Sequence, residues 1–171
     1  MHTSGTSNSN MTAETEPRLE LEVQHASEIS DVPEDEALHA WALAALGELP
    51  GPVELVIRIV DERESRALNA RYRGKDKPTN VLSFPFEAPP GVEVNHLGDL
   101  VICAAVVARE AAAQHKALDH HWAHMVVHGV LHLRGYNHLA DKQASEMETL
   151  EKHLLNTFGI PDPYVLNDTS V

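Results

Sequence analysis

A run of three histidines in the last third of the chain constrains its local fold most strongly. His128 and His132 are four residues apart, so on a helix their rings lie on one face, one turn apart. Gly135 follows three residues later, and glycine adopts the left-handed conformation that ends a helix at little cost. The chain then turns and brings in His138. The run therefore predicts a helix, a turn and three converging imidazoles.

These imidazoles have the spacing of a metal site. Three neutral histidines suit zinc best, although nickel, copper or iron also accept them, and a tetrahedral site with three protein ligands leaves one position for water or substrate. Structural zinc sites are closed and usually contain cysteine. Single histidines in a chain with 12 of them are usually surface or core residues, but three at this spacing rarely arise by chance. We therefore predict one Zn²⁺ per chain, bound by His128, His132 and His138.

A metalloprotease has to be considered because its pattern H-E-x-x-H-x-x-G-x-x-H has the same spacing, glycine included. In such proteases the glutamate that acts as general base follows the first histidine directly. The corresponding residue here is Gly129. The spacing of the ligands is retained without that base, which argues against a protease.

Length and composition describe one soluble domain. The chain has 171 residues, 43% of them hydrophobic and 5% aromatic, which is ordinary for a globular protein. Residues 1–17 are rich in Ser, Thr and Asn and are expected to form a disordered extension, followed by a single domain over 18–160 and a tail over 161–171. No apolar run is long enough for a membrane helix. Cys103 is the single cysteine, which suits a reducing cytoplasm.

Positive charge is concentrated in one part of an acidic chain. A net charge of −13 would argue against nucleic acid, because binding to phosphates depends on Lys and Arg. However, seven of the thirteen basic residues lie between residues 58 and 77: Arg58, Arg63, Arg66, Arg71, Arg73, Lys75 and Lys77. Pairing with Asp61, Glu62 and Glu64 on a helix surface would account for Arg63 and Arg66. The last four lie in or beside a loop, where anions are often bound.

The apolar pattern predicts alternating strands and helices. Strands are expected at 19–23, 53–60, 80–86 and 98–103. Helices are expected at 33–46, 61–72, 104–116, 119–133 and 145–158. Asp61 should cap the second helix, and Pro85 indicates an edge strand or a bulge. The expected fold is α/β or α+β, with about four strands in a mixed sheet and about five helices, and the histidine helix packed on the sheet.

Three longer motifs resemble those of the bacterial YbeY family. They are Leu68–Pro85 (LNARYRGKDKPTNVLSFP), Gly98–Ile102 (GDLVI) and the segment from His124 through the histidine run, and the resemblance extends over residues 19–166. It implies a metal-dependent endoribonuclease acting on single-stranded RNA, in maturation of the 3′ end of small-subunit ribosomal RNA and in ribosome quality control. The implied partners are ribosomal RNA and the small ribosomal subunit with its associated proteins.

The resemblance also implies roles for single residues. His128, His132 and His138 match the family's zinc ligands, and Arg73 matches the arginine regarded as important for activity. Asn137 stands where the family commonly has aspartate. A carboxylate there could support a ligand or a water, whereas an amide forms hydrogen bonds but does not accept a proton.

The leading hypothesis is hydrolysis of an RNA phosphodiester. Zinc would activate water or polarise a phosphoryl oxygen, with His128 at the metal and Arg73 as an electrostatic clamp on the phosphate. Arg71, Lys75 and Lys77 would bind the substrate, while His124 and Asn137 would support the ligands. The rival from another class is a non-catalytic ribosome assembly factor with a structural metal, and a protease ranks well behind both.

Several further residues have more than one interpretation. Asp76 and Asp99 are conceivable general bases, although a loop acid and a turn residue explain them equally well. His96, His115, His120 and His121 are expected at the surface. Thr79, Asn80 and Ser83 could line a cleft, but hydrogen bonds within the turn account for them as readily.

Overall fold

The computed structural model describes residues 18–92, 95–136 and 141–165. Within these residues four strands and five helices are found, in the order β1 (Leu19–Ala26), α2 (Asp35–Leu46), β2 (Val53–Val60), α3 (Glu62–Arg73), β3 (Val81–Pro85), β4 (His96–Cys103), α4 (Ala104–Ala113), α5 (Leu118–Leu133) and α6 (Asp141–Asn156). The α+β class expected from the sequence is confirmed. None of the five helices is both long and apolar enough to cross a membrane.

The strands form one mixed sheet in the order β1-β2-β4-β3. β1 pairs with β2 and β2 with β4 in parallel, whereas β3 and β4 form an antiparallel hairpin. β3 is therefore an edge strand. Pro85 is its last residue, paired with Gly98, where the missing N–H of proline costs least.

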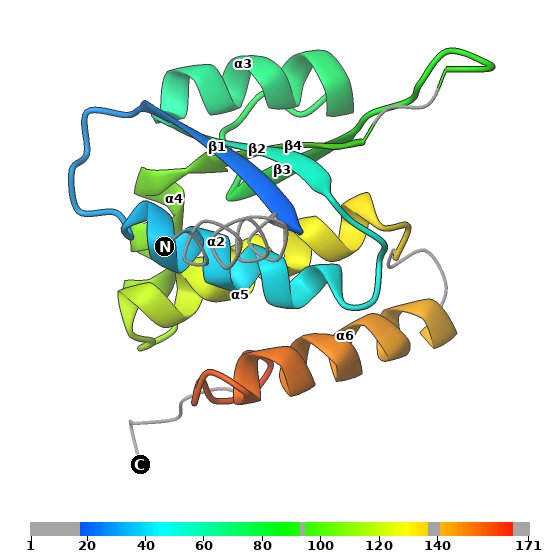
Figure 1. The fold of residues 1–171 in the computed structure, drawn as a ribbon. Helices are drawn as coiled ribbons and strands as arrows, with labels where there is room; N and C mark the ends of the chain where they lie inside the picture. Colours follow the sequence, from blue (N-terminus) through cyan, green and yellow to red (C-terminus); the bar gives the residue numbers. More distant parts are fainter. Residues whose placement is uncertain (1–17, 93–94, 137–140, 166–171) are drawn as a thin grey trace, which may run out of the picture.

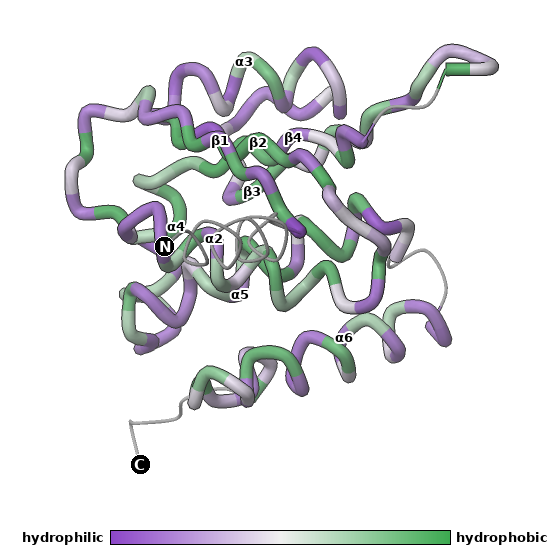
Figure 2. The backbone as a smooth tube through the Cα atoms, in the orientation of Figure 1, coloured by the Kyte–Doolittle hydropathy of each residue, from purple (hydrophilic) through white to green (hydrophobic). Residues whose placement is uncertain are grey.

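The sheet is covered on both faces (Figure 1). α3 lies on one face, α2, α4 and α5 lie on the other, and α6 packs on the outer side of α5. The larger core lies between the sheet and α5 and includes Leu55, Ile57 and Ile59 of β2. A smaller cluster, which includes Leu82 and Val101 and packs against Leu68 of α3, lies on the other face. Figure 2 shows the hydrophobic residues gathered along the strands and α5, and many hydrophilic residues on α3.

α5 approaches β4 unusually closely. Trp122, Val126 and Leu133 are buried, as their spacing on one stripe of the helix indicated. A Cβ atom added at Gly129 would lie 2.7 Å from Cδ2 of Leu100, which is itself fully buried in β4. A side chain at position 129 would therefore have to displace Leu100, so glycine fits best where the helix crosses the strand.

Several details differ from the expectations. β1 continues to Ala26, and α6 begins at Asp141 and ends at Asn156. Asp61 occupies the N-cap position of α3, but its carboxylate accepts hydrogen bonds from the Ser27 hydroxyl and the Glu28 backbone N–H and does not cap the helix. The Asp61 carboxylate instead binds the segment that follows β1. α4 ends at Ala113, earlier than expected, and His115 after it adopts φ 56°, a conformation that does not continue a helix.

Candidate metal centre

Four histidines follow one another along α5. His121, His124, His128 and His132 have successive ring centroids 6.1, 5.9 and 4.5 Å apart. Their spacing of three and four residues places them on one side of the helix, as the 3.6-residue period requires. At one end of this row His121 contacts Glu110, and at the other end His132 contacts His128, so the row has two parts.

His128 and His132 form the part that matches the predicted metal site. Their Nε2 atoms approach to 3.1 Å. Two nitrogens bound at about 2.1 Å to one tetrahedral ion would lie about 3.4 Å apart, so this pair is arranged as two ligands of one ion would be. His138 and Asn137, which were also assigned to the site, lie outside the described residues.

Glu151 of α6 contacts Nδ1 of His128, whereas Nε2 of the same ring faces His132. Nδ1 of His128 donates to Oε2 of Glu151 at 2.6 Å, and the hydroxyl of Tyr164 donates to Oε1. Because the proton of a neutral imidazole is then on Nδ1, Nε2 is the nitrogen with a lone pair for a metal. Carboxylates commonly orient metal-binding histidines in this way. The contacts of Glu151 thus fit the binding of an ion by Nε2 of His128.

Glu151 is ionised although its side chain has no exposure to solvent. Burial alone would raise the pKa of this carboxyl, but contacts with His124, His128 and Tyr164 lower its pKa to about 2. The same contact, together with burial, raises the pKa of the Tyr164 hydroxyl, which therefore stays protonated. A fixed negative charge thus stands behind the histidine pair.

His124 lies next to this carboxylate. Its Nε2 is 3.5 Å from Oε2 of Glu151 and 3.4 Å from the Tyr164 hydroxyl. Burial lowers the pKa of His124, which favours the neutral imidazole. His124, His128 and Glu151 each offer a ligand atom within 4.8 Å of the others, so these three could also hold an ion. That arrangement would replace the hydrogen bond between His128 and Glu151, whereas the arrangement through Nε2 keeps it.

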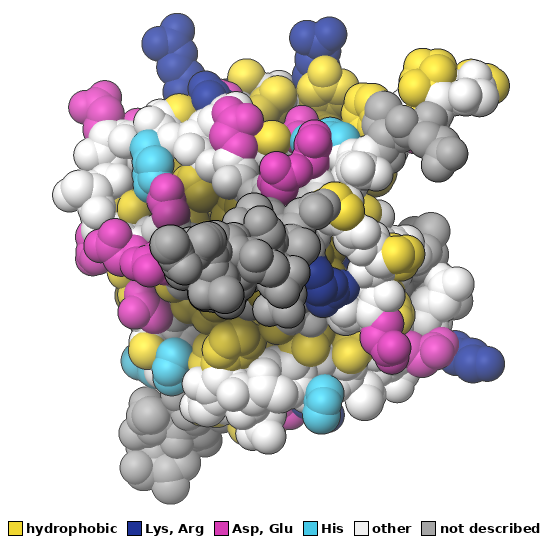
Figure 3. Space-filling model, in the orientation of Figure 1, with side chains coloured by type: hydrophobic (Ala, Val, Ile, Leu, Met, Phe, Trp, Pro, Cys, Tyr) yellow, Lys and Arg dark blue, Asp and Glu magenta, His cyan; other side chains and the backbone are white. Residues whose placement is uncertain are grey.

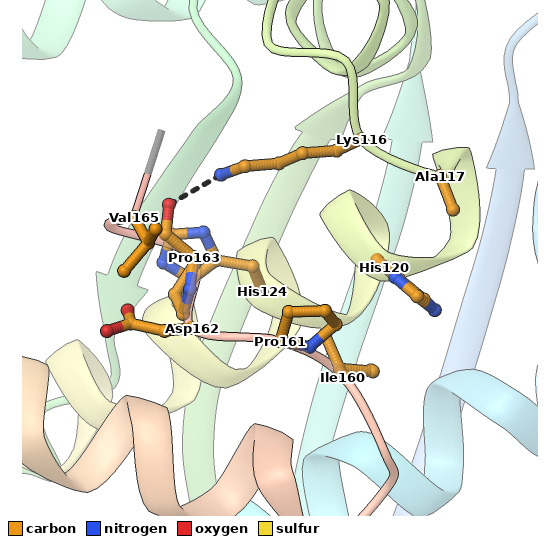
Figure 4. Close-up of a pocket in the computed structure, with 9 residues that line it drawn as sticks. All are labelled: Lys116, Ala117, His120, His124, Ile160, Pro161, Asp162, Pro163 and Val165. Atoms are coloured by element: carbon orange, nitrogen blue, oxygen red, sulfur yellow. Dashed lines mark hydrogen bonds between the residues drawn. The ribbon is translucent and has the colours of Figure 1, made fainter. Parts of the chain in front are cut away.

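The segment that follows α6 packs against His124. Together with Lys116 and His120 it encloses a cavity of about 260 Å³, whose apolar walls are Ile160, Pro161, Pro163 and Val165 (Figure 4). Lys116 Nζ donates to the carbonyl of Pro163 at 2.6 Å. This contact fastens the segment and so positions Tyr164 over Glu151.

Gly129 occupies the position at which a metalloprotease has its general base. A glutamate there would direct its Cβ into Leu100, at 2.7 Å. The residue after His128 therefore faces the core and not the metal pair, and this backbone has no room for the general base of a metalloprotease.

The basic residues between 58 and 77, on β2, on α3 and in the loop after it, include a paired and an unpaired group. Arg58 pairs with Glu64 at 2.6 Å and Arg66 pairs with Asp76 at 2.8 Å, rather than with a helix neighbour. The other group, which we call the basic cluster, consists of Arg71, Arg73, Lys75 and Lys77. All four are exposed, and in the described part of the chain none of them forms an ion pair.

The basic cluster and the histidine pair lie on opposite faces of the sheet. α3 covers one face and α5 the other (Figure 1). Among the described residues no contact joins Arg73 to the histidines. The two faces meet at β3, where Ser83 donates to the carbonyl of Gly129 at 3.3 Å and the next residue, Phe84, contacts Tyr72 of α3.

The surface prediction for His121 is wrong. This side chain is 3% exposed, and its Nε2 lies 2.8 Å from Oε1 of Glu110. Glu110 also accepts hydrogen bonds from the Asn80 amide. His121 therefore links α5 to α4 and the start of β3. His96 is half-buried and contacts Asp99 at 2.8 Å, His120 is half-buried, and His115 is exposed.

The two acids considered as general bases already have partners. Asp76 pairs with Arg66, which lowers the pKa of Asp76, and Asp99 pairs with His96. Of the polar residues before β3, Thr79 binds Ser65 through its main chain, and the Asn80 side chain accepts a hydrogen bond from the Val81 N–H. These contacts are structural.

Glu151 and Tyr164 were not predicted from the sequence. A signal for Glu151 was present: Met147, Glu151 and Leu155 follow one another at intervals of four residues, and all three are buried. A carboxylate on the apolar stripe of an amphipathic helix requires a buried partner. Tyr164 follows the last helix, and its position depends on tertiary packing alone.

Comparisons with known proteins identify the family of the chain. The family model described as endoribonuclease YbeY matches residues 21–159. A protein from Thermotoga maritima, whose structure was determined in solution, is 26% identical; the match covers 84% of this chain and 99% of that chain, with a TM-score of 0.53. The model spans most of the chain, from β1 through α6. The chain therefore belongs to the endoribonuclease YbeY family.

Proposed function

We propose that this chain is a zinc-dependent endoribonuclease that hydrolyses single-stranded RNA. The observation that supports this best is the 3.1 Å approach of Nε2 of His128 to Nε2 of His132, with the buried carboxylate of Glu151 holding His128. The family match and a basic cluster in a chain of charge −13 support a nucleic-acid substrate.

In this proposal His128, His132 and His138 hold the ion. When bound, zinc supplies a Lewis acid and lowers the pKa of its water to about 7. Glu151 fixes the orientation of His128, and His124 and Asn137 support the ligands. Arg73 lies on the other face of the sheet and would stabilise negative charge on a phosphate at the β3 edge, where the two faces meet. Arg71, Lys75 and Lys77 would bind the backbone of the substrate.

The proposed cellular role is maturation of the 3′ end of small-subunit ribosomal RNA and ribosome quality control in the cytoplasm. The partners would be ribosomal RNA and the small ribosomal subunit with its proteins. Residues 18–160 would form the nuclease domain, residues 1–17 an extension and residues 161–171 a tail, of which Tyr164 supports the site.

Cleavage of a labelled single-stranded RNA by highly purified protein tests this function. His128→Ala and Arg73→Ala should each abolish or strongly reduce turnover while the protein stays folded. Arg109→Ala, which removes a surface arginine paired with Glu62, is the matched control and should cleave like the wild type. Equal activity of all variants would point to a contaminating nuclease and would contradict the proposal.

The second candidate function is that of a ribosome assembly factor whose metal is structural. The burial of Glu151 and its contact with His128 would suit a structural ion as well. Cobalt in place of zinc separates the two functions: the visible spectrum of an open site changes when anions are added, and that of a closed site does not. A metalloprotease conflicts with the packing of Gly129 on Leu100.

A further inference from the structure

Large hydrophobic side chains are exposed at the end of α3 and along the β3–β4 hairpin. Tyr72 at the end of α3 is 56% exposed, Phe86 after β3 is 45% exposed, and Val92 in the hairpin loop is 49% exposed. Leaving such side chains in water sacrifices the stabilisation that burial would give. Exposed apolar groups that gather in one place commonly mark a binding surface.

The exposed rings are held by other rings. Tyr72 meets Phe84 edge to face, with centroids 5.1 Å apart, and Phe86 meets His96 in the same manner at 5.4 Å. The Phe86 N–H donates to the carbonyl of Leu97 at 3.1 Å, so the hairpin pairing continues one residue beyond β3. Phe84 and Phe86, two residues apart, therefore project from the same side of the chain. We call Tyr72, Phe84, Phe86 and His96 the aromatic platform. It lies on the α3 side of the sheet, beside the edge strand β3.

The charges around the aromatic platform favour a polyanion. The guanidinium of Arg71 lies 5.3 Å from the centroid of the Tyr72 ring, and Arg73, Lys75 and Lys77 continue from there. Figure 3 shows Lys and Arg side chains projecting beside hydrophobic ones at the α3 end of the molecule. Of the carboxylates in this region, Asp99 and Glu54 face His96 at 2.8 and 3.9 Å, and Asp76, between Lys75 and Lys77, pairs with Arg66. Surfaces for single-stranded nucleic acid combine these two elements, aromatic rings and basic side chains.

We propose that the aromatic platform binds bases of single-stranded RNA by stacking on Tyr72 and Phe86, while the basic cluster contacts the phosphates. This inference rests on the proposed function for its substrate. The edge of β3 connects the two faces, because Phe84 faces α3 and the preceding residue, Ser83, contacts Gly129 next to His128. A strand that leaves the aromatic platform and crosses this edge reaches the side of the histidine pair.

Two probes separate stacking from phosphate binding. The first is a fluorescent 2′-O-methyl oligouridylate of roughly twelve nucleotides, and the second has the same backbone without bases. With the metal-loaded protein, Tyr72→Ala and Phe86→Ala should each weaken binding of the first probe roughly 5- to 150-fold and leave the second unchanged. Tyr72→Phe and Phe86→Tyr keep the rings and should bind like the wild type.

Two control variants test whether the loss of binding is specific to the aromatic platform. Lys75→Ala should weaken binding of both probes by the same factor, and Phe158→Ala, which removes an exposed ring beyond α6, should affect neither. If the Tyr72 and Phe86 variants lose both probes equally, or lose neither, the aromatic platform does not stack bases, and a protein contact becomes its better explanation.

Cleavage of a ribo-oligonucleotide, measured in parallel, separates this inference from the proposed function. A selective loss of the base-bearing probe, together with no RNA cleavage by the wild type, would support the aromatic platform and overturn the nuclease. Cleavage without selective loss would overturn the aromatic platform alone.

Discussion

Glu151 has its charge at a position that water does not reach, on the side of His128 opposite His132. A buried carboxylate is tolerated only where donors satisfy it, and here Tyr164 and His128 donate to its two oxygens. The charge therefore acts on one imidazole. It keeps the proton on Nδ1 and so leaves Nε2, which faces His132, as the nitrogen that can bind a metal.

Replacement of Glu151 by Gln should weaken the binding of zinc. The amide keeps the size of the side chain but removes the charge, so we expect a loss of about 10- to 100-fold in metal affinity. Competition with a chromophoric chelator measures this. Glu146→Gln, at an exposed position of the same helix, is the control. Unchanged affinity in Glu151→Gln would show that the carboxylate does not act through His128.

At the scale of elements, α5 is the centre of the molecule, in contact with β3, β4, α2, α4 and α6. Its position along the sheet is set where Gly129 crosses Leu100. The histidine pair therefore stands on a helix that cannot shift without disturbing the core, which suits a site whose two nitrogens must stay close together.

Gly129→Ala should destabilise the fold despite the better helix propensity of alanine. The new methyl overlaps Leu100, which costs about 1–3 kcal/mol, whereas alanine gains about 1 kcal/mol in a helix, so a net loss of up to about 2 kcal/mol is expected. Urea unfolding measures it. In a Leu100→Ala background the same change should be neutral or stabilising. A loss of the same size in both backgrounds would mean that the overlap is not the cause.

Glu110 links α4 to α5 and to the start of β3 through His121 and Asn80. Burial would raise the pKa of Glu110, but these hydrogen bonds lower it below its ordinary value of 4.5. A lowered pKa in the folded state means that the contribution to stability is present above about pH 4.5 and is lost as the pH falls through the folded value.

Glu110→Gln should therefore reduce the acid sensitivity of the fold. The variant is expected to be less stable than the wild type near neutral pH, and the difference should shrink below about pH 4.5. Urea midpoints at several pH values test this. Glu36→Gln, exposed on α2, should show the same pH dependence as the wild type. A constant difference between Glu110→Gln and wild type at all pH values would contradict the argument.

The elements were largely predictable, because strands and helices leave a period in the sequence. The strand order was not, since it depends on pairing between distant segments such as β2 and β4. His128 and His132 were identified because four residues make one helical turn. Glu151 and the burial of His121 depend on contacts between helices, which local spacing does not encode.

At the scale of the whole molecule, charge is distributed unevenly. The protein carries −13 overall, yet the exposed end of α3 presents the basic cluster. Repulsion from the rest of the surface would confine an RNA strand to this end. The affinity for RNA should therefore depend strongly on salt concentration, and a small number of basic residues should account for this dependence.

Four phosphate contacts predict that log K falls with log salt at a slope of about −3 for a single strand. The double variant Lys75→Gln/Lys77→Gln should reduce the magnitude of this slope by about 1.4, because two contacts are lost. Lys142→Gln/Lys152→Gln on α6 changes the net charge equally and should leave the slope unchanged. Fluorescence anisotropy at a series of salt concentrations measures the slope. Equal slopes in both double variants would mean that the RNA does not bind at the basic cluster.

The close crossing of Gly129 over Leu100 also bears on how such a protein can evolve. Glycine and glutamate codons can differ by a single base, so mutation regularly produces the glutamate that a zinc protease has after its first histidine. In this fold the glutamate would have to displace Leu100, so the mutant loses stability before any new chemistry can be selected. A smaller residue at position 100 would have to come first, so the order of mutations, and not their rarity, separates the two kinds of enzyme.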